Sequence, residues 1–233
     1  MLANETQRVW DILKEQSLLD GFVLIGGTAL SLHIHHRISE DLDFAYTDVN
    51  LPRKRLDRLL QIGESLGLTI DRNDDPASLE DFLDAGLDLL DSQQDVVVNN
   101  AVKVSFFIPP RATMNVVSHY GRKGIPKVAS VDELFMTKAL VAADRSKTRD
   151  WFDLYVLLNE HGFDAKDFIK AFMINDAKLQ IDSALTRLSL CSPDAGDESY
   201  LAVSDNPPSL VQLREYFSKF RDEVECLIGA GIR

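Results

Sequence analysis

One sequence feature constrains the fold of this chain most. It is a short apolar run that ends in two glycines and is followed by two aspartates on a second expected strand. The run Phe22–Ile25 predicts a buried strand, and Gly26 and Gly27 end it where a helix over 28–35 is expected to begin. Glycine lets the backbone approach a ligand closely, and the N–H groups at a helix N-terminus attract phosphate. Thr28 can cap this helix or bind the phosphate itself. The pattern therefore predicts an anion site at the end of a strand.

Asp41 and Asp43 flank the start of a second expected strand, over 42–46. Alternate residues of a strand point to the same face, so the two carboxylates repel each other unless a cation lies between them. Mg²⁺ or Mn²⁺ is the natural occupant, because such a hard ion binds carboxylates together with substrate phosphates. An isolated Asp-x-Asp more often only flanks a strand end. The preceding Gly26-Gly27 favours instead a metal site that orients a nucleoside triphosphate.

The charge of the chain limits its partners. With 25 Lys and Arg against 37 Asp and Glu, the net charge is −12, which excludes a uniformly basic nucleic-acid or membrane binder. The charges are segregated: residues 71–95 hold nine acids and one base, whereas residues 101–149 hold nine bases and three acids. Runs of this kind are usually solvated surface, but the basic segment suits the phosphates of a nucleotide or an RNA.

Cysteine usage and hydropathy indicate the compartment. Two cysteines far apart, Cys191 and Cys226, exclude a disulfide scaffold and favour a reducing cytoplasm. The apolar runs fall short of the ~20 residues that a membrane span needs, and the N-terminus has no export signal. We therefore expect a cytoplasmic protein with no membrane partner.

Local patterns predict an α/β (α+β) fold in two domains. Further elements are expected as helices over 4–19, 52–65, from Val131 and over 148–160, and as a hairpin of strands 96–98 and 102–108. These elements make a small mixed sheet with helices over residues 1–160, and residues 161–233 are expected to form a C-terminal helical bundle. The cleft between the two domains is the expected active site.

A second group of charged residues lies near the predicted domain boundary. Lys138 and Arg145 share a helix face, and Asp150 and Asp153 share a face of the next helix. If the two helices fold back on each other, Lys138 can meet Asp153. The residues alone leave open whether this pair is an interhelical salt bridge or part of a functional site.

Four segments, in this order, resemble the AbiEii/AbiGii nucleotidyltransferase toxin family of the DNA polymerase β-like superfamily. They are Ile25–Leu30 followed by His36–Phe44, Val102–Phe107, Val128–Lys138, and Arg145–Tyr155. The resemblance implies a polymerase β-like nucleotidyltransferase domain. It also implies Mg²⁺-dependent transfer of a nucleoside monophosphate from a nucleoside triphosphate to an acceptor hydroxyl. It further implies a toxin of a type IV toxin–antitoxin or phage-defence system, with tRNA as the acceptor and a cognate antitoxin encoded nearby.

The resemblance also assigns roles to residues of the site. Lys138 matches the motif lysine and is expected to bind the triphosphate, and Asp153 is expected to orient it or the acceptor hydroxyl. Lys147 and Arg149 are expected phosphate contacts.

The segment before the acids matches as well, at Arg37 and Ser39. Arg37 either binds a phosphate with two donors or pairs with Glu40.

One departure from the superfamily concerns its third carboxylate. The corresponding strand offers Lys103 and Ser105 on one face and no acid. Asp43 and Asp153 therefore remain the candidates for the general base.

The core motifs do not identify the acceptor. A nucleotidyltransferase that modifies a protein or a small-molecule hydroxyl is one alternative, and a non-catalytic member that binds a nucleotide or a partner is another. A basic helix with Arg53, Lys54, Arg55 and Arg58 is either a solvated face or an RNA contact.

Overall fold

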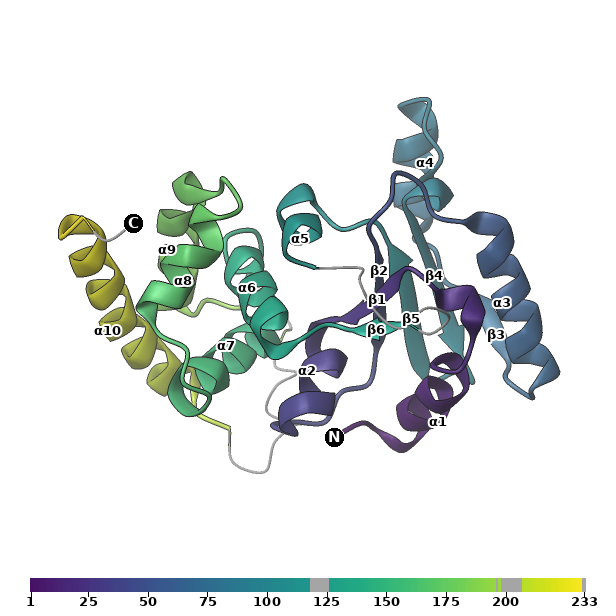
Figure 1. Cartoon of the computed structure of the whole chain (residues 1–233), viewed down its shortest axis with the longest axis horizontal. Coiled ribbons are helices and arrows are strands. Elements are labelled where there is room, and N and C mark those ends of the chain that lie inside the picture. The colour runs from purple at the N-terminus through teal and green to yellow at the C-terminus, as the bar shows by residue number, and fades with distance from the viewer. Residues whose placement is uncertain (118–125, 196, 198–206, 232–233) are drawn as a thin grey trace. The chain divides into compact units, whose positions relative to one another are not determined.

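The computed structural model describes residues 1–117, 126–195, 197 and 207–231, and the chain divides into two compact units, Met1–Ala129 and Ser130–Arg233. The first unit is a mixed sheet with helices and the second is helical, which confirms the α/β class (Figure 1). The division between the units precedes the expected boundary at residue 160, because the helices between 131 and 160 pack with the C-terminal helices. The assignment of domains by function stays a prediction.

The first unit contains six strands and five helices within its described residues. The strands are β1 (Phe22–Ile25), β2 (Leu42–Tyr46), β3 (Ile70–Arg72), β4 (Gln93–Val98), β5 (Val102–Phe107) and β6 (Lys127–Val128). The helices are α1 (Asn4–Leu13), α2 (Gly26–Ile34), α3 (Arg53–Ser65), α4 (Pro76–Asp84) and α5 (Arg111–Val116), with 3₁₀ turns η1 (Ser17–Leu19) and η2 (Leu89–Asp91).

The strands form one sheet in the order β3-β4-β5-β2-β1-β6, in which the pairs β1–β6 and β2–β5 are parallel and the others antiparallel. One face of the sheet is aromatic: the Phe44 and Phe106 ring centroids lie 5.4 Å apart, and Trp10 of α1 lies 6.2 Å from Phe44. Because side chains alternate along a strand, the residues next to Phe44 and Phe106 in β2 and β5 point to the opposite face of the sheet. That opposite face carries Asp43 and Ser105, which are direct partners in the β2–β5 register.

The predicted hairpin is confirmed. Its turn residues Asn99 and Asn100 have φ values of 52° and 53°, the left-handed region that asparagine tolerates. Strand β4 begins at Gln93, earlier than the expected start at Val96. The longer strand brings Asp95 into the sheet.

The second unit is helical throughout its described residues (Figure 1). Its helices are α6 (Val131–Val141), α7 (Thr148–Glu160), α8 (Ala165–Met173), α9 (Ile181–Leu190) and α10 (Leu210–Gly229), with a 3₁₀ turn η3 (Lys178–Gln180). The predicted capping box starts α6: Ser130 Oγ accepts from the Glu133 N–H at 3.3 Å, and Glu133 Oε2 accepts from the Ser130 N–H at 2.7 Å. Large apolar side chains such as Trp151, Phe168 and Phe217 form a buried core.

Among the described residues, no helix is both long and apolar enough to cross a bilayer. Both cysteines are free thiols, Cys191 buried and Cys226 exposed. Burial raises the pKa of Cys191 to about 12, so this thiol stays protonated at neutral pH.

Candidate active site

The two glycines after β1 make room for two charged side chains. Gly26 has a φ of +75°, and a Cβ at this position would lie 2.8 Å from Asp43 Oδ2. A Cβ on Gly27 would lie 2.1 Å from Arg37 Nη2. Asp43 is brought here by the sheet, because it is the register partner of Ile25 at the end of β1. The glycines therefore let a carboxylate and a guanidinium approach the N-terminus of α2.

Thr28 and Ser39 hold the segment that carries Asp41. The Thr28 hydroxyl donates a hydrogen bond to the Asp41 carbonyl and lies 2.7 Å from Ser39 Oγ. Both side chains are buried, at 2% and 5% exposure. These contacts fix the backbone just before β2, so Asp41 and Asp43 enter the site from a rigid segment.

Arg37 is also buried, at 4% exposure, and its Nη1 donates to the Ile38 carbonyl at 3.2 Å. Its position against Gly27 places a fixed positive charge beside the first turn of α2. A guanidinium and helix N–H groups together favour an anion such as phosphate.

The carboxylates of Asp41 and Asp43 fit a metal that its substrate helps to hold. Both side chains are partly exposed, and both offer hard oxygen donors. No group of three or more His, Cys, Asp or Glu within the described residues is arranged to bind a metal by itself. Mg²⁺ usually binds one or two protein carboxylates, and substrate phosphates and water complete its shell. The donor set therefore agrees with Mg²⁺ or Mn²⁺ bound together with a triphosphate.

In the second unit, Lys138 lies between two buried carboxylates. Its Nζ is 2.7 Å from Asp153 Oδ2 and also contacts Asp150 Oδ1, while Arg145 Nε lies 2.7 Å from Asp150 Oδ2. Lys138, Asp150 and Asp153 are only 6%, 3% and 0% exposed. The expected meeting of Lys138 with Asp153 is confirmed. Asp150 on α7 and Arg145 in the connection between α6 and α7 complete a cluster of two positive and two negative charges. The expectation that Lys138 and Arg145 share a helix face is wrong, because α6 ends at Val141.

The pKa of Asp150 reports the balance of forces in this cluster. Burial by itself raises the pKa of Asp150, but the charges of Lys138 and Arg145 outweigh it and hold the pKa below its usual range. Asp150 is therefore a carboxylate at neutral pH, and it keeps the Lys138 ammonium in a fixed position.

The N-terminus of α7 carries the other predicted phosphate contacts. Lys147 is half exposed, and its Nζ lies 3.4 Å from Asp194 Oδ2. The next residue, Thr148, donates its N–H to Asp197 Oδ2 at 2.9 Å and its hydroxyl to Asp197 Oδ1 at 3.2 Å. Arg149 is partly buried in the first turn. The side chains of Asp194 and Asp197 thus lie at the N-terminus of α7, where the phosphate contacts were expected.

The acidic run of residues 71–95 is not wholly solvated surface, and its last member belongs to the face of the sheet that carries Asp43. Asp95 is 4% exposed and is the register partner of Ser105, which is in turn the partner of Asp43. The acidic run in the sequence did not single out Asp95. The predicted Asn99-Asn100 turn could have indicated the position of Asp95. Extending the hairpin register from Val98 and Val102 places Asp95 opposite Ser105.

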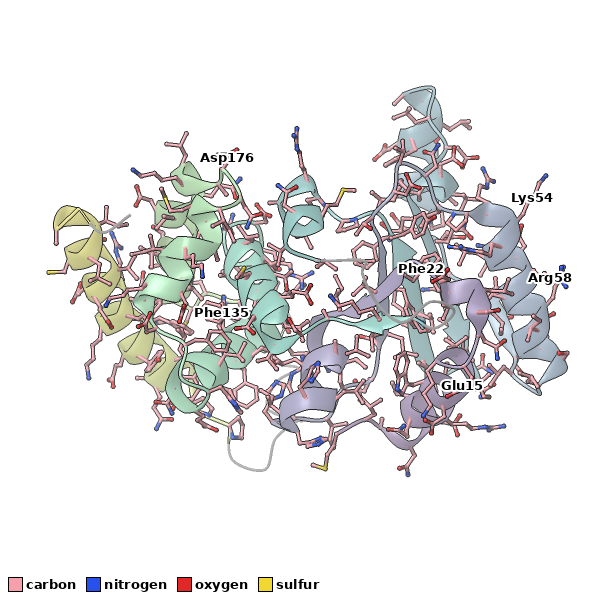
Figure 2. All side chains as sticks on the ribbon, viewed as in Figure 1. Glu15, Phe22, Lys54, Arg58, Phe135 and Asp176 are labelled. Carbon is pink, nitrogen blue, oxygen red and sulfur yellow. The ribbon has the colours of Figure 1, made fainter. Side chains whose placement is uncertain are left out.

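The four basic residues of α3 do not form one patch. Arg53 Nη1 lies 2.6 Å from Asp88 and 3.2 Å from Asp91, and Arg55 lies over the rings of Phe22 and Tyr46. Figure 2 shows Lys54 and Arg58 projecting outward from the helix, where they line a shallow hollow with Gln61 and Ser65. Lys54 and Arg58 are therefore exposed, whereas Arg53 is 42% exposed and bound to two aspartates, and Arg55 packs on aromatic rings.

Replacing Gly26 with alanine should inactivate the site without unfolding the protein. A left-handed alanine costs about 1–2 kcal/mol of stability, and its Cβ would push the Asp43 carboxylate away. Gly67→Ala is the matched control, because Gly67 has a similar φ of +86° and no atom within 4 Å of the added Cβ. We expect similar losses in thermal stability but a loss of pyrophosphate release in Gly26→Ala alone. Equal activity of the two variants would contradict the role given to Gly26.

Comparison with known proteins shows the family of the chain. A family model described as "Nucleotidyl transferase AbiEii toxin, Type IV TA system" matches residues 8–224. An uncharacterized protein of Aquifex aeolicus is 26% identical over 219 residues, which cover 94% of this chain and 95% of that protein.

Solved structures share the fold at low identity. JHP933 from Helicobacter pylori has a TM-score of 0.50 and 19% identity, covering 99% of this chain and 97% of its own. MenT4, a nucleotidyltransferase toxin from Mycobacterium tuberculosis, has a TM-score of 0.51 and 15% identity, covering 93% of this chain and 82% of its own. These similarities support the nucleotidyltransferase fold over nearly the whole chain.

Proposed function

Since the chain belongs to the AbiEii family of nucleotidyltransferase toxins, we propose that it transfers a nucleoside monophosphate from a nucleoside triphosphate to an acceptor hydroxyl on tRNA. The observation that carries the proposal is the packing of the Asp43 carboxylate against Gly26 at the start of α2. This packing puts a carboxylate oxygen that could bind a metal beside backbone N–H groups that favour phosphate. The contact between Asp43 and Gly26 joins the Gly26-Gly27 pair to the Asp41-x-Asp43 motif, the two sequence features that predict a metal-bound triphosphate.

Each part of the first unit has a distinct task in this proposal. Asp41 and Asp43 would hold Mg²⁺ or Mn²⁺, which when bound neutralises phosphate charge and orients the triphosphate. Gly26 and Gly27 admit the phosphates to the helix N-terminus, and Arg37 adds a buried positive charge there. Thr28 and Ser39 act through the Asp41 backbone. The chain itself thus supplies position and charge, the main requirements of phosphoryl-type transfer.

The second unit contributes the cluster around Lys138. Lys138 would bind the triphosphate, and Asp153 would orient it or accept the proton of the attacking hydroxyl. The contacts to Asp150 and Asp153 support this assignment, because they hold the buried Lys138 side chain in one position. Lys147 and Arg149 at the start of α7 would add phosphate contacts. Asp43 remains the alternative proton acceptor.

The biological role follows from the family. A toxin family of a toxin–antitoxin system implies an antitoxin as partner and a nucleoside triphosphate as substrate. We propose further that the chain acts in the cytoplasm, within a type IV or phage-defence system, on tRNA 3′ ends. The free thiols of Cys191 and Cys226 agree with a reducing compartment.

A labelling experiment tests the acceptor. The protein is incubated with Mg²⁺ and each α-labelled nucleoside triphosphate, together with total tRNA, total cellular protein or buffer alone. We expect pyrophosphate release that depends on tRNA, and label that co-migrates with tRNA and is lost after removal of its 3′ end.

Label on protein instead would replace the tRNA assignment by the protein-modifying alternative. Failure to release pyrophosphate with any triphosphate and either acceptor pool would contradict the proposed reaction. Growth arrest on induction, relieved by a neighbouring antitoxin gene, tests the toxin role separately.

A further inference from the structure

We propose that Lys103, held in place by Asp95, binds a phosphate of the nucleotide beside Asp41 and Asp43. This inference rests on the proposed function and extends it by one subsite. Lys103 would be a binding residue of the reaction and Asp95 a positioning residue. Both lie on β-strands of the first unit.

The sheet register places Lys103 next to the two aspartates. Leu42 pairs with Val104 and Asp43 with Ser105 across the parallel strands β2 and β5. Lys103 therefore lies one residue before the paired segment of β5, just as Asp41 does on β2. Because side chains alternate, Lys103 and Ser105 point to the same face of the sheet as Asp43. An ammonium group is thus carried on the strand adjacent to the predicted metal ligands.

Asp95 holds Lys103 from the opposite side, on β4. Lys103 Nζ lies 3.0 Å from Asp95 Oδ2, and Gln93 Nε2 donates to the same oxygen at 3.1 Å. The Asp95 backbone N–H donates to Asp74 Oδ1 at 2.7 Å, which fixes the strand at this point. The Lys103 side chain is 45% exposed, whereas that of Asp95 is 6% exposed. The carboxylate is therefore a rigid anchor, and the ammonium keeps access to solvent and ligands.

The unequal use of the Asp95 oxygens argues against a purely structural ion pair. Asp95 Oδ1 is buried and has no hydrogen-bond partner among the residues that the structure describes. An unsatisfied buried carboxylate oxygen costs stability, and apolar residues often replace such a pair without loss. Stability of the fold therefore does not account for Asp95. A role in positioning Lys103 near the substrate does.

Distance separates this role from metal binding. Asp95 lies two strands from Asp43, about 10 Å at the backbone, so the two cannot share one Mg²⁺ with bonds of about 2.1 Å. Lysine is a flexible point charge with three donors, and only one direction is taken by Asp95. Phosphate oxygens of a triphosphate bound at Asp41 and Asp43 are the anions within reach of the others. The strand that lacks the superfamily's third carboxylate would then contribute a cation.

Substitution of Lys103 with methionine tests the subsite, with Lys103→Arg as the conservative variant. We expect Lys103→Met to raise the KM for the nucleoside triphosphate about tenfold with a smaller change in kcat, and Lys103→Arg to restore most of the loss. The matched control is Lys14→Met on α1, which removes an exposed lysine paired with Asp11 at 2.5 Å and should change neither constant. An unchanged KM in a folded Lys103→Met protein would overturn the proposal.

A double-mutant cycle tests the role of Asp95. Asp95→Asn should raise KM severalfold in the wild-type background and have no effect once Lys103 is methionine, because the carboxylate acts only through the lysine. Independent, additive effects of the two substitutions would rule out Asp95 as a positioning residue for Lys103.

Calorimetric binding of Mg²⁺-pyrophosphate separates failure of this subsite from failure of the proposed function. If the wild-type protein turns over no triphosphate, weaker pyrophosphate binding by Lys103→Met still supports the subsite. Equal binding by the two proteins, or no binding by either, overturns it.

Discussion

Replacing Asp43 with alanine is expected to lower the rate of pyrophosphate release by at least about 100-fold. A catalytic metal contributes several kcal/mol of charge stabilisation, and about 1.4 kcal/mol corresponds to a factor of ten in rate. Asp43 lies against the start of α2, where we propose that the phosphates bind, since its Oδ2 would lie 2.8 Å from a Cβ on Gly26. The measurement is steady-state pyrophosphate release across a range of Mg²⁺ concentrations. Asp41→Ala should behave in the same way.

Asp48→Ala is the matched control for this experiment. Asp48 follows the same strand, is exposed, and accepts a hydrogen bond from the neighbouring Val49 N–H at 2.8 Å. Its substitution should leave the rate unchanged. If Asp43→Ala keeps more than a tenth of the wild-type rate while remaining folded, the carboxylate does not belong to the reaction centre.

Replacing Lys138 with methionine is expected to destabilise the protein by about 3–5 kcal/mol, the usual effect of removing one partner of a buried ion pair. The substitution takes away the ammonium that faces both Asp150 and Asp153, which are almost fully buried. Chemical denaturation at neutral pH measures the loss. Arg145→Met provides the control, because Arg145 contacts the same Asp150 but is 55% exposed and can be replaced by water. It should cost much less, and equal losses would show that burial does not determine the effect.

The pH dependence of this loss has a definite sign. In the wild-type protein the pKa of Asp150 is lowered, so its contribution to stability is present above the unfolded-state pKa and is lost as pH falls through the folded value. Without Lys138, Asp150 loses one of the two cations that lower its pKa, so burial acts more strongly to raise that pKa. The carboxylate then destabilises the fold at neutral pH, and it does so less once it is protonated. The difference between the wild type and Lys138→Met should therefore shrink as the pH is lowered. A difference that stays constant with pH would contradict the electrostatic explanation.

Local sequence patterns predicted the secondary structure of the site well. The capping box at Ser130, the strand over 42–46 and the helix over 148–160 were all confirmed, because caps, alternation and periodicity are short-range properties. Helical spacing also predicted that Lys138 would meet Asp153. No short-range pattern of this kind supported the expected boundary at residue 160. Compact units are defined by packing between segments that are distant in the sequence.

The sequence did not identify Asp95, and it did not show which basic residues of α3 are engaged by other side chains. Asp95 was one acid within an acidic run, and only its pairing with Ser105 across the hairpin shows that it is buried beside the site. On α3, the four basic residues left open a solvated face or an RNA contact. Arg53 and Arg55 instead contact Asp88 and the Phe22 ring, which belong to other segments of the chain. In both cases the deciding contacts join residues that are far apart in the sequence.

The sequence by itself determined the chemistry that this nucleotidyltransferase can perform, whereas the tertiary structure decided which charged groups surround that chemistry. Gly26-Gly27 and Asp41-x-Asp43 are recognisable in the sequence because the spacing within a strand–helix–strand unit is fixed by the backbone. The proximity of Gly27 to Arg37, of Lys103 to Asp95, and of Lys138 to Asp150 depends on register and side-chain packing. Coulomb interactions act over a few ångströms in space, irrespective of separation along the chain. The net charge of −12 therefore says little about a site whose charges are paired by the fold.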